Sequence, residues 1–378
     1  MNQSRKNSPD YLFLFLTMIL TAFGLLMVYS ASSMISAYEN KGDSLRFVIT
    51  QGIAVGLGLF MMLILMNVHY SLIRKLVFLL WFGNLFLLVL VLFIGNGDTA
   101  KSWIDLGPIN LQPSEFAKLA VILYLAVVVT NKGEKIKKFK KGLFPCLMII
   151  GMTGGLIMLQ PDFGSTAILV LGAFAVLWVG GMRTKHLLTI GVFTGSLVFL
   201  KIFLPSFLNP KEPNYQLERF LTMLDPWRDP TDSGYQMINS LYAFGHGGLT
   251  GAGMGNSIQK LHFLTQSYSD FIFSIIGEEL GFLMTVVFLI IYSLFVWRGI
   301  IVSLRCPNKF ASLAGVGIMS TIGIQALINL LGVTNTIPMT GVTLPLISYG
   351  GSSILATLIS IGIVLGISRE QIERKKKH

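Results

Sequence analysis

Long apolar stretches, separated by short polar segments, run along almost the whole chain. Most of them hold about 20 residues, the length at which an α-helix crosses the hydrocarbon core of a bilayer. The predicted spans are roughly 11–31, 46–67, 74–96, 114–130, 143–160, 164–181, 187–205, 269–297, 309–332 and 346–368. The pattern therefore predicts an all-α integral membrane protein with about ten transmembrane helices, forming a single polytopic membrane domain over residues 1–378.

The first apolar stretch runs from Tyr11 to about Tyr29, behind Arg5 and Lys6. It is longer than the core of a signal peptide and carries no convincing cleavage site. We therefore expect it to be retained as the first span.

Basic residues test this map independently, because the cytoplasmic loops of membrane proteins are rich in lysine and arginine. With residue 1 in the cytoplasm, most of the 29 lysines and arginines fall in inner segments. The inner set is Arg5, Lys6, Arg74, Lys75, Lys132, Lys135, Lys137, Lys138, Lys140, Lys141, Arg183, Lys185, Arg298, Arg305, Lys309, Arg369, Arg374, Lys375, Lys376 and Lys377. An even number of spans then places both termini in the cytoplasm.

One loop is much longer than the others and is predicted to be extracytoplasmic. It covers about 206–268 and contains Pro210, Pro213, Pro226 and Pro230, so it cannot be one continuous helix. Residues 235–246 have a mixed helical periodicity that fits a helix lying along the membrane surface. Long ordered loops are uncommon unless they are functional, so we expect the chemistry on this face.

Composition supports the membrane assignment and narrows the function. Hydrophobic residues make up 53% of the chain and charged residues 12%, against about 25% charge in soluble domains. The net charge of +11 is distributed in short runs between apolar stretches, which argues against nucleic acid as a partner. Cys146 and Cys306 lie too far apart in sequence to suggest a disulfide framework or a metal site, and we interpret them as buried apolar residues.

Charged residues inside spans are costly and suggest functional sites. Glu115 and Lys118 begin the fourth span on one helix face. They form either a structural ion pair or a site in which Lys118 holds an anionic headgroup and Glu115 positions it. Asp162, after Pro161, either caps the next helix or lines a cavity.

Three further acidic residues flank or enter the eighth span. Asp270 is explained simply as a residue at a helix start. Glu278 and Glu279 are adjacent and point in different directions on a helix, so we expect at least one of them to pair with a base.

The long loop contains a polar set that is either a water-facing surface or a site. Its members are Arg219, Asp225, Arg228, Asp229, Asp232, Gln236 and Lys260. The three aspartates lack the spacing of metal ligands, which leaves open a Mg²⁺ ion bridged through substrate phosphates. Residues 251–255 (GAGMG) follow no strand, so they predict a tight turn or close backbone packing instead of a nucleotide site.

Several motifs together carry a resemblance to a known family. They are GLLMVYSAS (24–32), LQPSEFAKLA (111–120), LQPDFGST (159–166), DPWRDPTDSGYQ (225–236), DFIFSIIGEELGF (270–282) and TGVTLPLISYGGSS (340–353). In this order, over nearly the whole chain, they resemble the SEDS family of bacterial cell-wall polymerases, which includes FtsW, RodA and SpoVE. The motifs are more similar to FtsW and SpoVE than to RodA. The chain departs from the family at Arg228, where members often have Glu, and at residues 264–269.

The resemblance implies an inverting glycosyltransferase that polymerises lipid II, in division or sporulation, with release of undecaprenyl pyrophosphate. It matches Asp229 to the family's essential acid, and Arg219 to a basic position. Asp229 would take a proton from the sugar hydroxyl, while Arg219, Lys118 and Lys260 would neutralise the pyrophosphate. Glu115, Gln236 and Asp162 complete the predicted substrate-binding set.

The resemblance also implies partners and a location, and two other functions have to be considered beside the polymerase. The expected partners are a class B penicillin-binding protein and divisome proteins, in the bacterial cytoplasmic membrane and at the division septum. A lipid II flippase is the alternative from another class, although paired repeats of the kind seen in transporters are not obvious. A scaffold for the division machinery is compatible with either activity.

The predicted topology can be tested by labelling. A single Asp229→Cys substitution is expected to react with a membrane-impermeant maleimide in intact cells, because the loop is predicted to face outward. A Lys138→Cys substitution in an inner loop is the control and should react only after lysis. Protection of position 229 until lysis would contradict the topology.

Overall fold

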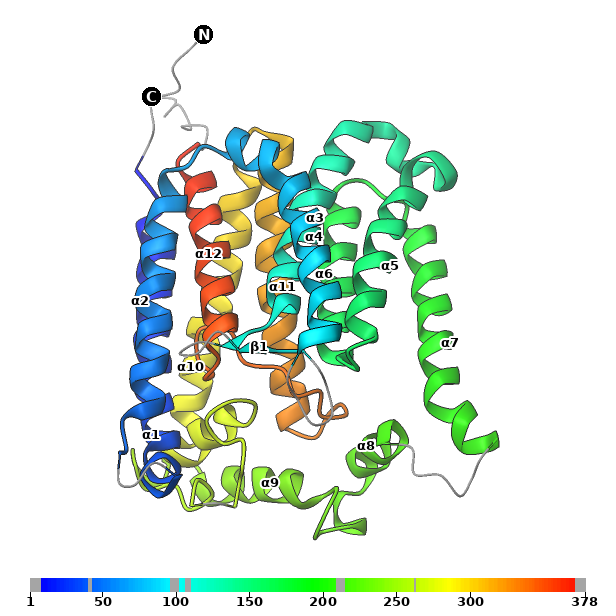
Figure 1. Ribbon diagram of the computed structural model, residues 1–378. Helices are drawn as coiled ribbons and strands as arrows, with labels where there is room; N and C mark the ends of the chain where they lie inside the picture. Colours follow the sequence, from blue (N-terminus) through cyan, green and yellow to red (C-terminus); the bar gives the residue numbers. More distant parts are fainter. Residues whose placement is uncertain are drawn as a thin grey trace.

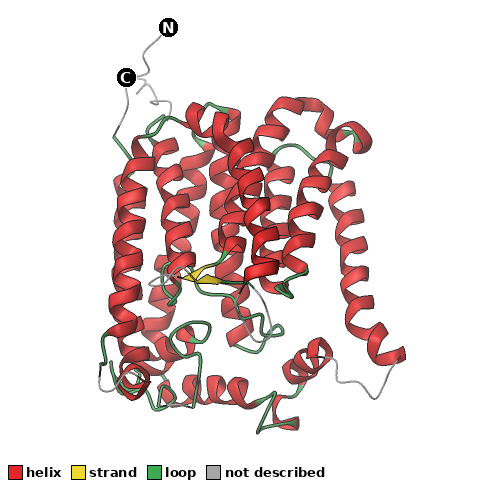
Figure 2. Cartoon of the chain, viewed as in Figure 1, coloured by secondary structure: helices red, strands yellow, loops and turns green. Residues whose placement is uncertain are grey.

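The protein is described by a computed structural model that covers residues 8–39, 43–95, 102–105, 110–208, 215–261 and 263–370. Its long helices form a bundle, and shorter helices of the outer loop lie across one end of it (Figures 1 and 2). The helices are α1 (Tyr11–Glu39), α2 (Arg46–Asn67), α3 (Tyr70–Ile94), α4 (Pro113–Lys132), α5 (Phe144–Met158), α6 (Phe163–Val179), α7 (Thr184–Leu208), α8 (Tyr215–Leu224), α9 (Tyr235–Gly247), α10 (Ile272–Leu304), α11 (Lys309–Val333) and α12 (Gly351–Ser368). The predicted fold class, an all-α membrane protein with one large loop, is confirmed.

Short elements complete the described chain. A pair of two-residue strands, β1 (Ile104–Asp105) and β2 (Asn110–Leu111), precedes α4. Three single-turn elements follow: η1 (Gly133–Lys137), η2 (Phe139–Leu143) and η3 (Pro226–Arg228). None of them changes the helical character of the bundle.

Eight helical stretches among the described residues are long and apolar enough to cross a membrane: α1, α2, α3, α4, α10, α11, α12 and the continuous stretch of η2 and α5 (Phe139–Met158). The apolar α6, with 17 residues, and α7, with 25, lie where the other two spans are predicted. α7 stands at the edge of the bundle in Figure 1. The total of ten spans stays a prediction.

The first and last helices meet at one end of the bundle. The backbone N–H of Asp10, just before α1, donates to the Oγ of Ser368, the last residue of α12, at 3.0 Å. Arg298 of α10 donates to both carboxylate oxygens of Asp10, at 3.1 and 2.6 Å. The outer-loop helices α8 and α9 lie at the opposite end (Figure 1). This arrangement fits the even number of crossings that the sequence predicts.

Small residues let the central helices approach closely, as they do in membrane proteins generally. On α12, a Cβ at Gly362 would lie 2.8 Å from the Cα of Met62, so α12 packs directly on the backbone of α2. On α11, a Cβ at Gly317 would meet Ile122 of α4 at 2.6 Å and Val176 of α6 at 2.4 Å. These contacts place α11 and α12 at the centre of the bundle.

The helix α10 is interrupted at Gly281, which has a φ of 73°. The glycine-rich segment fills the interruption: Ala252 and Gly253 donate their N–H groups to the carbonyls of Glu278 and Glu279 at 2.9 and 3.0 Å. A Cβ at Gly251 (φ +84°) would lie 2.3 Å from Glu279 O. This is the close backbone packing that the sequence predicts for residues 251–255.

The Asp10 junction generates a stability prediction. Asp10→Ala removes a side chain that accepts from Phe13 N–H at 2.9 Å and pairs with Arg298. Loss of such a helix cap typically costs about 1–2 kcal/mol, so the melting temperature in detergent should fall by several degrees. Glu134→Ala, which breaks an exposed pair with Lys137, is the matched control and should leave it unchanged. Equal melting temperatures for both variants would contradict the prediction.

Candidate functional site

Asp229, the predicted base, lies in the outer loop directly after η3. Its carboxylate accepts hydrogen bonds from its own loop: Ser233 N–H at 3.4 Å, Ser233 Oγ at 3.3 Å and Thr231 Oγ1 at 3.4 Å. These bonds, led by the one from the Ser233 backbone, lower the pKa of Asp229 below its usual value. The side chain is therefore a carboxylate at neutral pH and a weak base.

Arg219, on α8, reaches toward the non-helical segment between α11 and α12. Its Nη1 donates to the backbone carbonyl of Met339 at 2.7 Å. This segment, residues 334–350, is called the α11–α12 loop below. Arg219 therefore joins the outer loop to the outer end of the bundle.

Asp270 lies at the junction of the outer loop with α10 and is partly buried. Its Oδ2 lies against the α11–α12 loop, 3.4 Å from where a Cβ on Gly341 would be. Burial raises the pKa of Asp270 to about 6, the positive charge of Arg219 opposes this rise, and the negative charge of Asp162 adds to it. Asp270 therefore has both charges within electrostatic reach.

Asp162 caps α6, one of the two roles that the sequence leaves open. Its Oδ1 accepts from Ser165 N–H at 2.9 Å. Its Oδ2 accepts from Gln112 Nε2 at 3.4 Å and from Ser114 Oγ at 3.5 Å, both at the start of α4. The carboxylate thus also tethers α4 to α6 beside Asp270.

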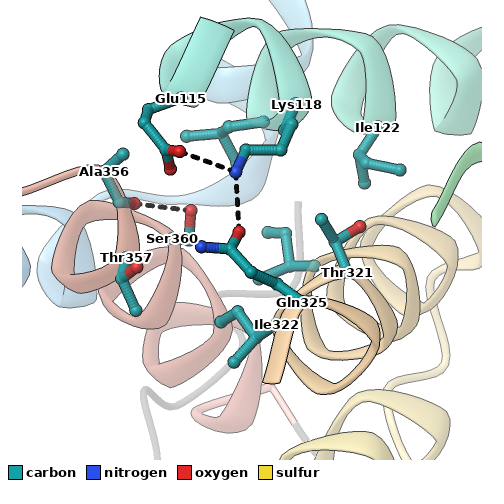
Figure 3. Close-up of a pocket in the computed structure, with 11 residues that line it drawn as sticks. Glu115, Lys118, Ile122, Thr321, Ile322, Gln325, Ala356, Thr357 and Ser360 are labelled. Carbon is teal, nitrogen blue, oxygen red and sulfur yellow. Dashed lines mark hydrogen bonds and ion pairs between the residues drawn. The ribbon is translucent and has the colours of Figure 1, made fainter. Parts of the chain in front are cut away.

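Glu115 and Lys118 form a buried ion pair in the bundle. Lys118 Nζ contacts Glu115 Oε1 at 2.9 Å and Gln325 Oε1 at 2.6 Å. Figure 3 shows these groups in a small pocket between α4, α11 and α12, which Thr321, Thr357 and Ser360 also line. The charge of Lys118 is neutralised here by Glu115, so the structural ion pair that the sequence allows is present. Its predicted role with substrate stays a prediction.

Lys260 and Gln236 take partners other than Asp270. Lys260 is buried and pairs with Glu279 at 2.8 Å, with Ser30 Oγ at 3.3 Å. Glu278 pairs with His246 at 2.8 Å, so the prediction that at least one of these acids meets a base is confirmed. Gln236 Nε2 on α9 donates to Thr265 Oγ1 at 2.7 Å.

The structure thus groups three charged residues, Asp270, Arg219 and Asp162, at the outer end of the bundle. Two of them belong to the predicted site, and Asp270 was interpreted only as a helix start. One feature of the sequence could have identified Asp270 as a site residue: it is an acid at the start of a span, directly after the long polar loop. Among the residues that the structure describes, no three His, Cys, Asp or Glu side chains come together as a metal site.

Comparison with known proteins shows which family the chain matches. A family model described as cell cycle protein, FTSW_RODA_SPOVE, matches residues 10–373. The chain is 41% identical to stage V sporulation protein E of Bacillus subtilis (strain 168), over 97% of this chain and 98% of that one. It is 38% identical to the probable peptidoglycan glycosyltransferase FtsW of the same organism, over 98% of this chain and 93% of that one.

Solved structures give the same result. A chain from a peptidoglycan synthase complex, described as coordinating polymerization and crosslinking, matches with a TM-score of 0.79 and 32% identity, over 97% of this chain and 99% of that chain. The rod shape determining protein RodA of Thermus thermophilus matches with a TM-score of 0.70 and 29% identity, over 97% of this chain and 98% of that chain. Fold and sequence therefore agree along nearly the full length.

The raised pKa of Asp270 generates a prediction about stability and pH. The folded protein binds the Asp270 proton more tightly than the unfolded chain does. Ionisation of Asp270 therefore lowers the free energy of unfolding, with the full loss above about pH 6 and no loss below about pH 4. Asp270→Asn should therefore stabilise the protein at pH 7.5, by up to about 3 kcal/mol, and lose this advantage toward pH 4.5. Thermal unfolding in detergent at both pH values measures it. A variant less stable than the parent at pH 7.5 would show that Arg219 outweighs burial.

Proposed function

Because the chain belongs to the FtsW, RodA and SpoVE family of cell cycle proteins, we propose that it is a peptidoglycan glycosyltransferase. Relatives at 36–38% identity carry that name. We propose further that it polymerises lipid II into glycan strands and releases undecaprenyl pyrophosphate. A multi-pass membrane fold suits a substrate with a polyprenyl tail, since enzyme and substrate are then confined to the same bilayer.

The proposed reaction is one inverting displacement. The 4-hydroxyl oxygen of the acceptor sugar attacks the anomeric carbon of the donor, and the bond from that carbon to the pyrophosphate oxygen breaks. The hydroxyl proton passes to a carboxylate, and the pyrophosphate leaves with the bonding electron pair. An α-linked donor gives a β-linked product in one step, so no covalent intermediate is needed.

The observation that carries the proposal is that Asp270 lies against the α11–α12 loop, within electrostatic reach of Arg219 and Asp162. A general base works best when its pKa lies near the working pH, and burial raises the pKa of Asp270 to about 6. Asp229 was the base predicted from sequence, but hydrogen bonds within its loop lower its pKa. Burial against the α11–α12 loop and the nearby charge of Arg219 therefore favour Asp270 as the base, and Asp229 remains the alternative to be tested beside it.

Arg219 is the candidate to neutralise the pyrophosphate, since it lies at the outer end of the bundle within electrostatic reach of Asp270. Lys118 and Lys260 are already paired with Glu115 and Glu279, so a headgroup could use their charges only after those pairs open. Mg²⁺ would need the substrate phosphates as its main ligands, because the described residues offer no cluster of three ligating side chains.

The setting follows from the same relatives. A similar chain occurs in a peptidoglycan synthase complex, which supports a class B penicillin-binding protein as the partner that crosslinks the glycan. Names that refer to FtsW and to sporulation support a place in the cytoplasmic membrane at a division or spore septum, together with divisome proteins.

The proposal is tested by incubating lipid II with the purified chain and its partner in detergent and measuring glycan polymer. Wild-type protein should make polymer, whereas a flippase would make none, because detergent micelles have no second leaflet. Asp270→Asn should lower the rate at least about 100-fold, the usual contribution of a positioned base. Asp229→Asn should retain most of the rate.

The reverse pattern would restore the original assignment. If Asp229→Asn abolishes polymer and Asp270→Asn does not, Asp229 is the base and the geometric proposal fails. Asp232→Asn, in the same loop as Asp229, is the matched control for loss of a negative charge at the outer surface.

A further inference from the structure

Asn329 joins three segments at the outer end of the bundle. It lies on α11, about one turn before the helix ends, and its side chain is 1% exposed. Its Nδ2 donates to the backbone carbonyls of Asp270 and Val342, both at 2.8 Å. Because both partners are acceptors, the amide nitrogen must face them. One side chain therefore ties α11 to the residue before α10 and to the α11–α12 loop.

The backbone that carries Asp270 is held at three successive residues. Tyr349 N–H donates to the carbonyl of Tyr268 at 2.9 Å, and Ser348 Oγ donates to the carbonyl of Ser269 at 2.7 Å. Both of these donors belong to the α11–α12 loop itself. Asn329 supplies the third bond, to Asp270, from a buried helix. Of the three donors, Asn329 is the one that lies on a long helix of the bundle.

The same loop connects Asp270 to Arg219. Met339 accepts from Arg219, and Gly341 (φ +69°) lies against Asp270 Oδ2. Val342, the next residue, is the second partner of Asn329. A displacement of Val342 would therefore move the backbone that faces the carboxylate and the backbone that holds the guanidinium.

We propose that Asn329 is a positioning residue for glycosyl transfer, fixing the Asp270 carboxylate relative to Arg219. The proposal rests on the proposed function, with Asp270 as its base. Reacting groups must be held within a fraction of an ångström, and a displacement of about 1 Å can cost 100-fold in rate. Asn329 makes no contact with the carboxylate and acts only through the two backbone segments.

The amide oxygen of Asn329 differs from its nitrogen, because it has no partner in the described part of the chain. Its Oδ1 is buried and has no hydrogen-bond partner among the described residues. A buried acceptor without a partner destabilises the folded state. Asn329→Leu removes that oxygen while keeping nearly the same shape, but it also takes the Nδ2 donor away from the carbonyls of Asp270 and Val342. The folded fraction of the variant is therefore measured beside its activity, and the rate of the folded protein reports the position of Asp270.

The test measures kcat, KM for lipid II and the pH–rate profile of purified Asn329→Leu with its partner, normalised to the folded fraction from size-exclusion chromatography. We expect kcat to fall about 10- to 100-fold with KM changed less than about threefold. The acid limb of the profile should move to lower pH, because a carboxylate released toward water returns to its ordinary pKa. Asn329→Ser, which keeps one donor, should be intermediate.

The matched control is Asn84→Leu on α3. Asn84 is also a buried amide that donates to a backbone carbonyl, that of Pro113 at 3.1 Å, but it contacts neither Asp270 nor the α11–α12 loop. It should leave kcat and the acid limb unchanged. Wild-type kcat and an unmoved acid limb in folded Asn329→Leu, or in Asn329→Ser if the Leu variant does not fold, would overturn the proposal. Failure of the proposed function is distinct: wild-type protein would make no polymer, or Asp270→Asn would polymerise normally.

Discussion

The structure depends on one requirement: the non-helical backbone of the α11–α12 loop, at the outer ends of the membrane helices, must find hydrogen-bond partners. Such backbone is tolerated only where the protein itself supplies hydrogen-bond partners. The α11–α12 loop obtains them from side chains of four helices, among them Tyr292 of α10, whose hydroxyl donates to Pro345 O at 3.2 Å. Gln51 of α2 binds Ser348 O and Gly350 N, Arg219 of α8 binds Met339 O, and Asn329 of α11 binds Val342 O. The loop is therefore attached to the surrounding helices at several points.

The position of the proposed base follows from this constraint. Asp270 lies against the loop, and Asn329 binds its carbonyl. The charge of Arg219 reaches it because the same loop accepts from that guanidinium. A carboxylate held in this way is partly removed from water, which accounts for its raised pKa and suits it to accept a proton near neutral pH.

The sequence predicted the fold well because bilayer thickness imposes a simple length rule. The predicted and observed bounds of the second span are identical, and those of the eleventh helix differ by one residue. The interruption at Gly281 was not predicted, because it depends on hydrogen bonds from a glycine-rich segment about thirty residues earlier in the chain.

The site was predicted less completely, because ion pairing depends on tertiary packing. Lys118 and Lys260 are basic residues near the outer loop or a span, yet each is buried against a glutamate. Asp229 carries the expected charge in the expected loop, but its partners are neighbours in sequence. Nothing in the sequence near residue 270 shows that Arg219 and Asp162 lie within electrostatic reach of it. Asp270 can therefore be identified as a candidate base only in the folded chain.

The most direct measurement of the central claim is a structure of the chain with a bound lipid II analogue whose donor cannot leave. The account predicts the acceptor 4-hydroxyl within about 3.2 Å of the Asp270 carboxylate, with the pyrophosphate on the side of Arg219. A headgroup bound at Asp229, with Asp270 sealed behind the α11–α12 loop, would contradict it.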